Sequence, residues 1–474
     1  MINSKLIIII KSFTKKEIKD FTLFLNSALF NKNTEVIKLY QLLKKYYPHF
    51  DNKLITHEAL SEKITGKRNI KKLRYIMTDL TKLAEKFIVF KHFNSTLNHN
   101  SQHLLSAYQE RNLFKYFHEE LQKTQYQLNN ISSVRNDTYY KHTHEINELS
   151  YLVSHKNSAR NTDSELQHLS DHLDLYYLTK KLKYSSEIIN RMNILRTNYN
   201  IEFLEKLLPI IEADSIKNNP VIKVYLLVLK TLRFPENEKT YHLLRAAINK
   251  NIKYFNNEEQ YDLYGYLQNY CIKKINSGKN NYLMLLFENY TEMISNKVII
   301  KDNQITQFDF KNIITVALRV EKYDWATNFI HEFKSFLPEK ERANAIAYNQ
   351  ARIEFYKKNY SIGLKTLLSV EFTDVFYSLD SRVLILKTYF ELEDYEAALS
   401  LINSFKIYLK RDKKISDFQN STYSGFIKIF NLLIRFKLGY LNDLNYIENE
   451  LENIKQIADS TWLNQKIEIL KKCY

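Results

Sequence analysis

Apolar residues recur at spacings of three and four along most of the chain, which is the pattern of amphipathic helices. The clearest example lies between residues 70 and 90. Its apolar positions are Leu73, Ile76, Met77, Leu80, Leu83, Ala84, Phe87 and Ile88. Such spacing places the apolar side chains on one face of a helix, so the sequence predicts an all-α fold.

The first 95 residues carry the start and stop signals of four helices. Thr14 and Glu17 have the spacing of a capping box ahead of an apolar face. A second helix covers residues 35–47, and a third begins at Thr56 and closes near Gly66. Together with the helix at 70–90 they predict a small helical domain over residues 1–95.

Residues 96–200 keep the helical pattern with a more polar composition, and we expect long helices there. The segment from Ser154 to Glu165 is polar and aperiodic. It is either a loop between two long helices or a break between subdomains.

Beyond residue 200, two segments align without a gap at an offset of 35 residues. The alignment places Ala351 on Leu386, Phe355 on Phe390, Tyr360 on Tyr395 and Gly363 on Ala398. A third segment from Ile314 places Tyr323 and Ala326 in the same columns at an offset of 37. Weaker copies lie at 224–248 and 269–290, and residues 418–470 supply a last polar pair. Periods of this length indicate a helical repeat array.

These copies resemble tetratricopeptide repeats, a family of helical hairpins with a period of about 34 residues. The resemblance implies an α-solenoid over residues 201–474, clearest at 308–410, preceded by the small basic helical domain. It assigns hairpin packing to an aromatic residue and a small residue three positions later, namely Tyr323 with Ala326, Tyr360 with Gly363, and Tyr395 with Ala398. The family's late proline is missing from all three copies, and its turn glycine is replaced. The whole chain also resembles long all-helical proteins without an assigned activity.

The amino-acid composition excludes several classes of fold and function. Only 6 Gly and 5 Pro occur in 474 residues, too few for the turns of a β-sandwich or for glycine-rich nucleotide loops, so no cofactor is expected. Cys271 and Cys473 do not make a disulfide framework or a zinc site, which fits a reducing cytoplasm. The apolar run Leu6–Ile10 is too short for a signal peptide or a membrane span. We expect it to be a buried helix or strand of a cytoplasmic protein.

The positive charge is concentrated at the start of the chain. Residues 1–95 hold a net charge of +11 out of a total of +16. Two interpretations stay open. The excess of lysine reflects a coding bias, or it attracts a polyanionic partner to the N-terminal domain.

Residues 56–83 predict a helix, a short turn and a second helix, with five cations at the turn and the next helix start: Lys67, Arg68, Lys71, Lys72 and Arg74. In helix-turn-helix proteins this region contacts phosphates and bases. The element loosely resembles the DNA-binding part of winged-helix regulators, although no β-hairpin wing follows Phe90. The competing interpretation is a solvated basic face on an ordinary bundle.

Candidate chemistry is sparse. Four acidic residues, Glu391, Glu393, Asp394 and Glu396, fall within six positions, and the repeat alignment places them at a hairpin turn, where they indicate solvation and helix capping. His168 and His172 have metal-ligand spacing beside Asp171, and His142 and His144 form a weaker pair. Without the glutamate of the H-E-x-x-H pattern, a helix surface is the simpler interpretation. We expect no metal site and no catalytic residue.

The sequence therefore predicts a non-enzymatic scaffold, or a subunit of a larger assembly, that binds a protein or peptide through its repeats. The alternative is a nucleic-acid-binding or regulatory protein that contacts DNA or RNA through its basic N-terminal domain. A hydrolase that uses a carboxylate or histidine site is a third, remote hypothesis. The sequence indicates no small-molecule substrate.

Overall fold

The computed structural model describes residues 3–50, 55–95, 97–130, 133–157, 165–195, 197–213, 215–369, 375–412, 414–454 and 456–473. Within these ranges the regular elements are helices, and the only β-type pairing is an isolated bridge between Lys301 and Gln304. The predicted all-α fold is confirmed. None of the described helices is long and apolar enough to cross a lipid bilayer. The chain divides into two compact units, residues 1–177 and 178–474, while the boundaries predicted at residues 95 and 200 stay predictions.

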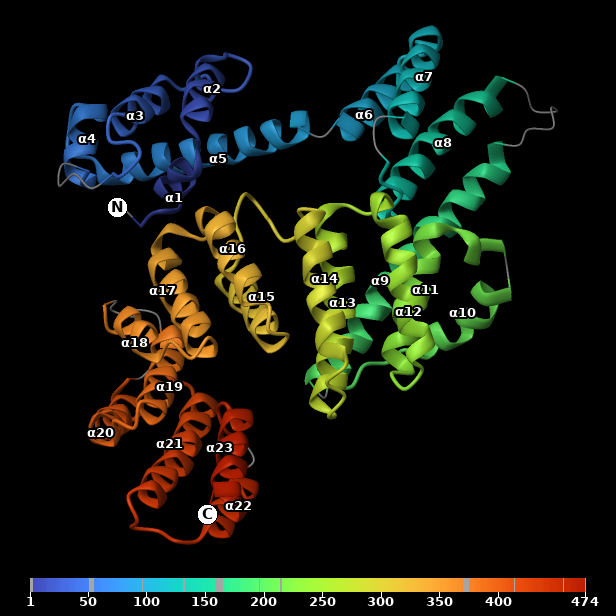
Figure 1. Cartoon of the computed structure of the whole chain (residues 1–474). Coiled ribbons are helices and arrows are strands. Elements are labelled where there is room, and N and C mark those ends of the chain that lie inside the picture. Colours follow the sequence, from blue (N-terminus) through green and yellow to red (C-terminus); the bar gives the residue numbers. More distant parts are fainter. Residues whose placement is uncertain are drawn as a thin grey trace. The chain divides into compact units, whose positions relative to one another are not determined.

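Unit 1 begins with a helical bundle (Figure 1). Its helices are α1 Lys5–Ser12, α2 Lys15–Asn26, α3 Thr34–Lys44, α4 His57–Thr65 and α5 Ile70–Ser95. The long helix α5 packs against the other four. Its buried face contains Leu73, Ile76, Leu80, Leu83, Ala84 and Phe87, whereas Ile88, which the periodicity placed on the same face, is 42% exposed. The run Leu6–Ile10 forms part of α1, with Ile7 and Ile10 fully buried.

The capping signals of this bundle behave as the sequence predicts. Thr14 accepts a hydrogen bond from the Glu17 amide at 3.2 Å, and the Glu17 carboxylate accepts one from the Thr14 amide at 2.8 Å. Thr56 caps α4, and Gly66 ends it with a left-handed φ of 70°. These bonds satisfy backbone groups that have no partner inside the helix.

The rest of unit 1 contains α6 Leu97–Glu110, α7 Phe114–Asn130, α8 Asp137–Asn157 and the start of α9 Glu165–Leu195. Leu105, Phe117, Leu121 and Val153 belong to a second core in this region. Residues 158–164, the centre of the segment that the sequence left open between loop and subdomain break, lie outside the described residues.

Unit 2 continues with helices that pack mostly as consecutive pairs (Figure 1). They are α10 Glu202–Ala213, α11 Pro220–Arg233, α12 Glu238–Asn251, α13 Asn257–Asn276, α14 Tyr282–Ser295, α15 Gln307–Arg319, α16 Tyr323–Phe333, α17 Glu339–Tyr356, α18 Tyr360–Leu368, α19 Val375–Glu391, α20 Tyr395–Arg411, α21 Asp417–Lys437, α22 Leu444–Glu452 and α23 Ser460–Cys473. In several cases the first helix of a pair also contacts the first helix of the next pair, as α15 does with α17 and α17 with α19.

Three of these pairs share one turn geometry. Glu321, Lys358 and Glu393 have left-handed φ values of 59°, 64° and 59°, and they stand at the same offsets of 37 and 35 residues as the aligned copies. In each case the next amide donates to the carbonyl five residues back: Lys322 to Ala317, Asn359 to Glu354, and Asp394 to Tyr389. This is the Schellman ending of a helix, built here without glycine.

The small residues of the aligned copies lie where the two helices of a pair approach each other. Ala326, Gly363 and Ala398 are buried, and a Cβ on Gly363 would lie 3.1 Å from the carbonyl oxygen of Ala351. The aromatic partners pack on the end of a neighbouring helix. Their ring centroids lie 6.5 Å apart for Tyr323 and Tyr356, 5.4 Å for Tyr360 and Phe355, and 5.9 Å for Tyr395 and Phe390.

Candidate functional site

The five cations that the sequence singled out lie at the turn between α4 and α5, which holds Lys67 and Arg68, and in the first residues of α5, which hold Lys71, Lys72 and Arg74. Hydrogen bonds from the buried side of the turn fix its backbone. The buried Ser61 hydroxyl accepts a hydrogen bond from the Asn69 amide at 2.7 Å and donates one to the Lys67 carbonyl at 3.2 Å. Asn69 in turn accepts from the Lys72 amide at 2.9 Å. The turn therefore presents its side chains from a fixed backbone.

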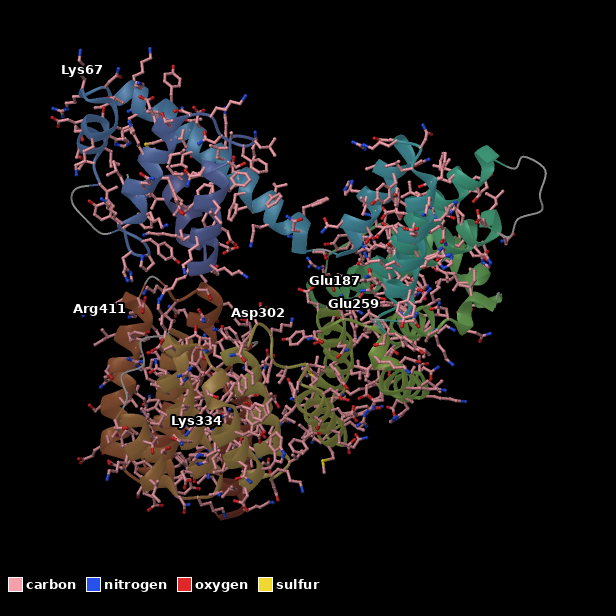
Figure 2. All side chains as sticks on the ribbon, turned by 90° about the horizontal axis from the view of Figure 1, so that it is seen from above. Lys67, Glu187, Glu259, Asp302, Lys334 and Arg411 are labelled. Carbon is pink, nitrogen blue, oxygen red and sulfur yellow. The ribbon has the colours of Figure 1, made fainter. Side chains whose placement is uncertain are left out.

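All five cations are exposed, and three of them form no ion pair with a described residue. Lys72 pairs with Glu35 at 2.5 Å and Arg68 with Glu58 at 3.7 Å. Lys67, Lys71 and Arg74 form no ion pair with any residue that the structure describes. Figure 2 shows Lys67 at the outer edge of the bundle. The turn can therefore meet a polyanion without first breaking ion pairs at these three positions.

A second candidate site runs across the first helices of successive hairpins in unit 2, and we call it the polar stripe. It consists of Lys311, Thr315, Arg352, Asp380, Lys387, Glu391, Asp459 and Lys466. Arg352 and Lys387 within it are buried. Thr315, Arg352 and Lys387 occupy one column of the aligned copies, since they are 37 and 35 residues apart. Repetition of the hairpin thus places polar groups side by side on successive first helices.

The first part of the stripe joins three helices through one carboxylate. Asp380 on α19 pairs with the Lys311 ammonium on α15 and accepts a hydrogen bond from the Tyr423 hydroxyl on α21 at 2.7 Å. Burial lowers the pKa of Lys311, and the charge of Asp380 opposes that shift. The pair therefore links first helices that are two hairpins apart.

The second part repeats this arrangement further along the chain. Lys387 on α19 pairs with Asp459 at the start of α23, and its ammonium lies 4.7 Å from the ring of Phe355. Glu391 accepts hydrogen bonds from Trp462 at 3.1 Å and from Lys466 at 2.7 Å. Here too α19 contacts the helix two pairs away.

Arg352, at the centre of the stripe, lacks the carboxylate that its neighbours have. Its side chain is 9% exposed. One guanidinium nitrogen donates to the Thr315 hydroxyl at 2.8 Å, and the guanidinium lies 5.6 Å from the Tyr348 ring. No carboxylate of the described residues forms an ion pair with it. Because a guanidinium has five donors, Arg352 can still bind an anionic group.

Three of the four clustered acidic residues, Glu393, Asp394 and Glu396, lie at the hairpin turn and the start of α20. Asp394 caps α20 by accepting from the Ala397 amide at 3.1 Å. Glu393 is the left-handed residue of the turn, and Glu396 lies in the first turn of α20. The positions agree with the sequence interpretation, in which these acids solvate a hairpin turn.

The remaining histidines and cysteines of the described residues were candidates for a metal site or a nucleophile. No group of three His, Cys, Asp or Glu side chains that could hold a metal ion occurs among the described residues. Burial raises the pKa of the Cys271 thiol to about 11, and Tyr241 lies 3.1 Å from its sulfur, so this cysteine is a poor nucleophile at neutral pH. His142 is buried and lies 3.3 Å from Glu145.

Sequence reasoning missed most of the polar stripe. The available signal was a cation inside an otherwise apolar helical segment at equivalent positions of two copies, Arg352 and Lys387. The partners Asp380 and Asp459 carried no such signal, because pairing across about 70 residues depends on how the hairpins stack. No family model, curated protein or solved structure matches the chain.

Proposed function

We propose that residues 201–474 form an α-solenoid of tetratricopeptide-like hairpins and act as a non-enzymatic scaffold that binds a protein or peptide partner. Support comes from the shared turn geometry at Glu321, Lys358 and Glu393, which follows the repeat offsets, and from the contacts between successive first helices. Repeat arrays of this kind present an extended surface to their partners. We place the protein in the cytoplasm.

Arg352 carries the proposal. Leaving a buried guanidinium without a carboxylate costs free energy, and a partner that supplies an acidic side chain would recover part of that cost. The flanking cations Lys311 and Lys387 already have their own carboxylates, so they do not compete for this group. We therefore expect an acidic segment of the partner to lie along the stripe.

Affinity capture from a native lysate of the source cells tests this function. The full chain should recover a stoichiometric protein, and Arg352→Gln should lose it. Arg342→Gln is the matched control, because Arg342 lies on the same helix and, among the described residues, donates hydrogen bonds only to the carbonyls of Ser335 and Leu337. A wild-type chain that stays an isolated monomer would count against the scaffold, as would capture that is equal for both variants.

The basic turn supports a second candidate function, binding of DNA or RNA by the N-terminal domain. The specific observation is that Lys67, Lys71 and Arg74 are exposed without ion pairs among the described residues. Released counterions make such binding strongly dependent on salt.

Retention on a nucleic-acid column tests the second candidate. Changing Lys67, Arg68, Lys71, Lys72 and Arg74 together to Glu should abolish retention at low salt, and the wild-type affinity should fall as salt rises. A matched control reverses five exposed lysines of unit 2: Lys250, Lys322, Lys334, Lys340 and Lys365. If the control loses as much retention as the test variant, net charge is responsible and the site is refuted.

A further inference from the structure

Unit 1 contains a cavity of about 370 Å³ lined by residues of α7, α8 and α9. The chain carries a net charge of +16, yet among the described residues no Lys or Arg lines this cavity, and Glu165 is the only carboxylate in that part of the lining. The lining also includes Gln125, Asn147, His168 and His172. The cavity is therefore a locally acidic, polar site on a basic protein.

One oxygen of Glu165 has no partner among the residues that the structure describes. Its Oε2 atom is buried and accepts no hydrogen bond from any of them. Removing a carboxylate oxygen from water without a donor is unfavourable. A ligand that donates a charged N–H group into the cavity would satisfy this atom.

His172 adds a second acceptor on the same face of α9. Its Nδ1 atom lies 2.7 Å from the carbonyl oxygen of His168, and a carbonyl only accepts, so Nδ1 carries the proton. In the neutral ring Nε2 is then left as an acceptor. Residues 165 and 172 are two helical turns apart, which places both groups along one side of α9.

The carboxamides of Gln125 and Asn147 also line the cavity. Neither side chain forms a hydrogen bond with any part of the chain that the structure describes, and their oxygens can accept as well. Their cavity thus offers a carboxylate, an imidazole nitrogen and two amide oxygens to one ligand, while its volume suits a small metabolite.

We propose that this cavity binds a small organic cation with a primary ammonium or guanidinium group. Glu165 pairs with the charge, and His172 and the amide oxygens accept the remaining N–H groups. A metal ion is a poorer occupant, because the described residues supply no group of three metal-binding side chains. The site is separate from both surfaces of the proposed function, so the two proposals stand or fall independently.

Isothermal titration calorimetry with the full chain tests the site. The probes are agmatine and putrescine, with uncharged 1,4-butanediol and Zn²⁺ as comparisons. We expect saturable binding of one of the amines, weakened by about tenfold or more in Glu165→Gln. Asn147→Asp, which adds a carboxylate to the lining, should tighten it.

Glu148→Gln is the matched control, because Glu148 is exposed on α8 and does not line the cavity. Its affinity for the amine should stay within about twofold of the wild type. The proposal is overturned if neither amine binds at millimolar concentration, if Glu165→Gln binds like the wild type, or if butanediol or Zn²⁺ binds in preference. Circular dichroism confirms that each variant keeps its helical content.

Discussion

Lys311 and Asp380 show how a single pair of residues holds distant hairpins together. Both side chains are largely buried, at 16% and 18% exposure, and Asp380 also accepts from Tyr423. A buried pair contributes little in total, because desolvation cancels much of the attraction, but removing one partner leaves the other charge stranded. Removing one partner should therefore destabilise the fold more than replacing both.

We predict that Asp380→Ala lowers the free energy of unfolding by about 3 kcal/mol, because it removes the carboxylate that pairs with the largely buried Lys311 ammonium and accepts from the Tyr423 hydroxyl. The double change Lys311→Met with Asp380→Leu should recover most of that loss. Urea denaturation measures both. Asp324→Ala is the control, since Asp324 is 94% exposed in its pair with Lys357 and should change stability by no more than about 0.5 kcal/mol. Equal losses in the single and double variants would contradict the prediction.

Helix boundaries account for most of what the sequence could predict. The starts at Thr14 and Thr56 and the stop at Gly66 rest on local hydrogen bonds or on a left-handed glycine, so short sequence signals were sufficient. The turns at Lys358 and Glu393 gave no glycine signal. The left-handed conformation of these residues is set by the Schellman bonds and by the packing of the following helix. A lysine or glutamate in the sequence gives no signal of either.

The missing glycines lead to a prediction about the turn after α17. Lys358 has a φ of 64°, which costs a residue with a side chain more than it costs glycine. Lys358→Gly should therefore raise the free energy of unfolding by about 1 kcal/mol. Lys358→Val should lower it by at least a similar amount, because β-branched residues tolerate the left-handed region worst. Thermal and urea unfolding of the wild type and the two variants give the order of their stabilities. A glycine variant that is less stable than the wild type would contradict the left-handed conformation of residue 358.

At the scale of the whole molecule, many tyrosine rings are part of the core. Tyr40, Tyr241, Tyr264, Tyr282 and Tyr377 are among the largest fully buried side chains. Hydrophobic periodicity can indicate which rings face the core, but it does not identify the partners of their hydroxyl groups. Tyr40 donates to the Ile18 carbonyl at 2.9 Å, and Tyr241 lies in a polar group with Asn289 and Cys271. Those partners come from other helices, so they follow from the tertiary arrangement.

These buried hydroxyls predict a loss of stability in alkali. Burial raises the pKa of Tyr241, Tyr348 and Tyr423 above the usual value, and nearby acidic groups raise it further, Asp380 in the case of the last two. Above about pH 10 the unfolded chain releases tyrosine protons that the folded chain keeps, so the folded state binds more protons and stability falls as pH rises. Each such tyrosine adds up to about 1.4 kcal/mol per pH unit to the slope.

Lys311 acts in the opposite direction, because its pKa is lowered in the folded state. The free energy of unfolding therefore rises with pH until the pH reaches the ordinary pKa of lysine. One lysine cannot offset several tyrosines, so the net effect is a decline. Ultraviolet absorbance near 295 nm should show these tyrosines ionising together with the loss of helical circular dichroism. Urea denaturation should show a shallower decline for Tyr348→Phe than for the wild type. If instead most tyrosines titrated near their ordinary pKa while the helices stayed intact, the buried hydroxyl network would be wrong.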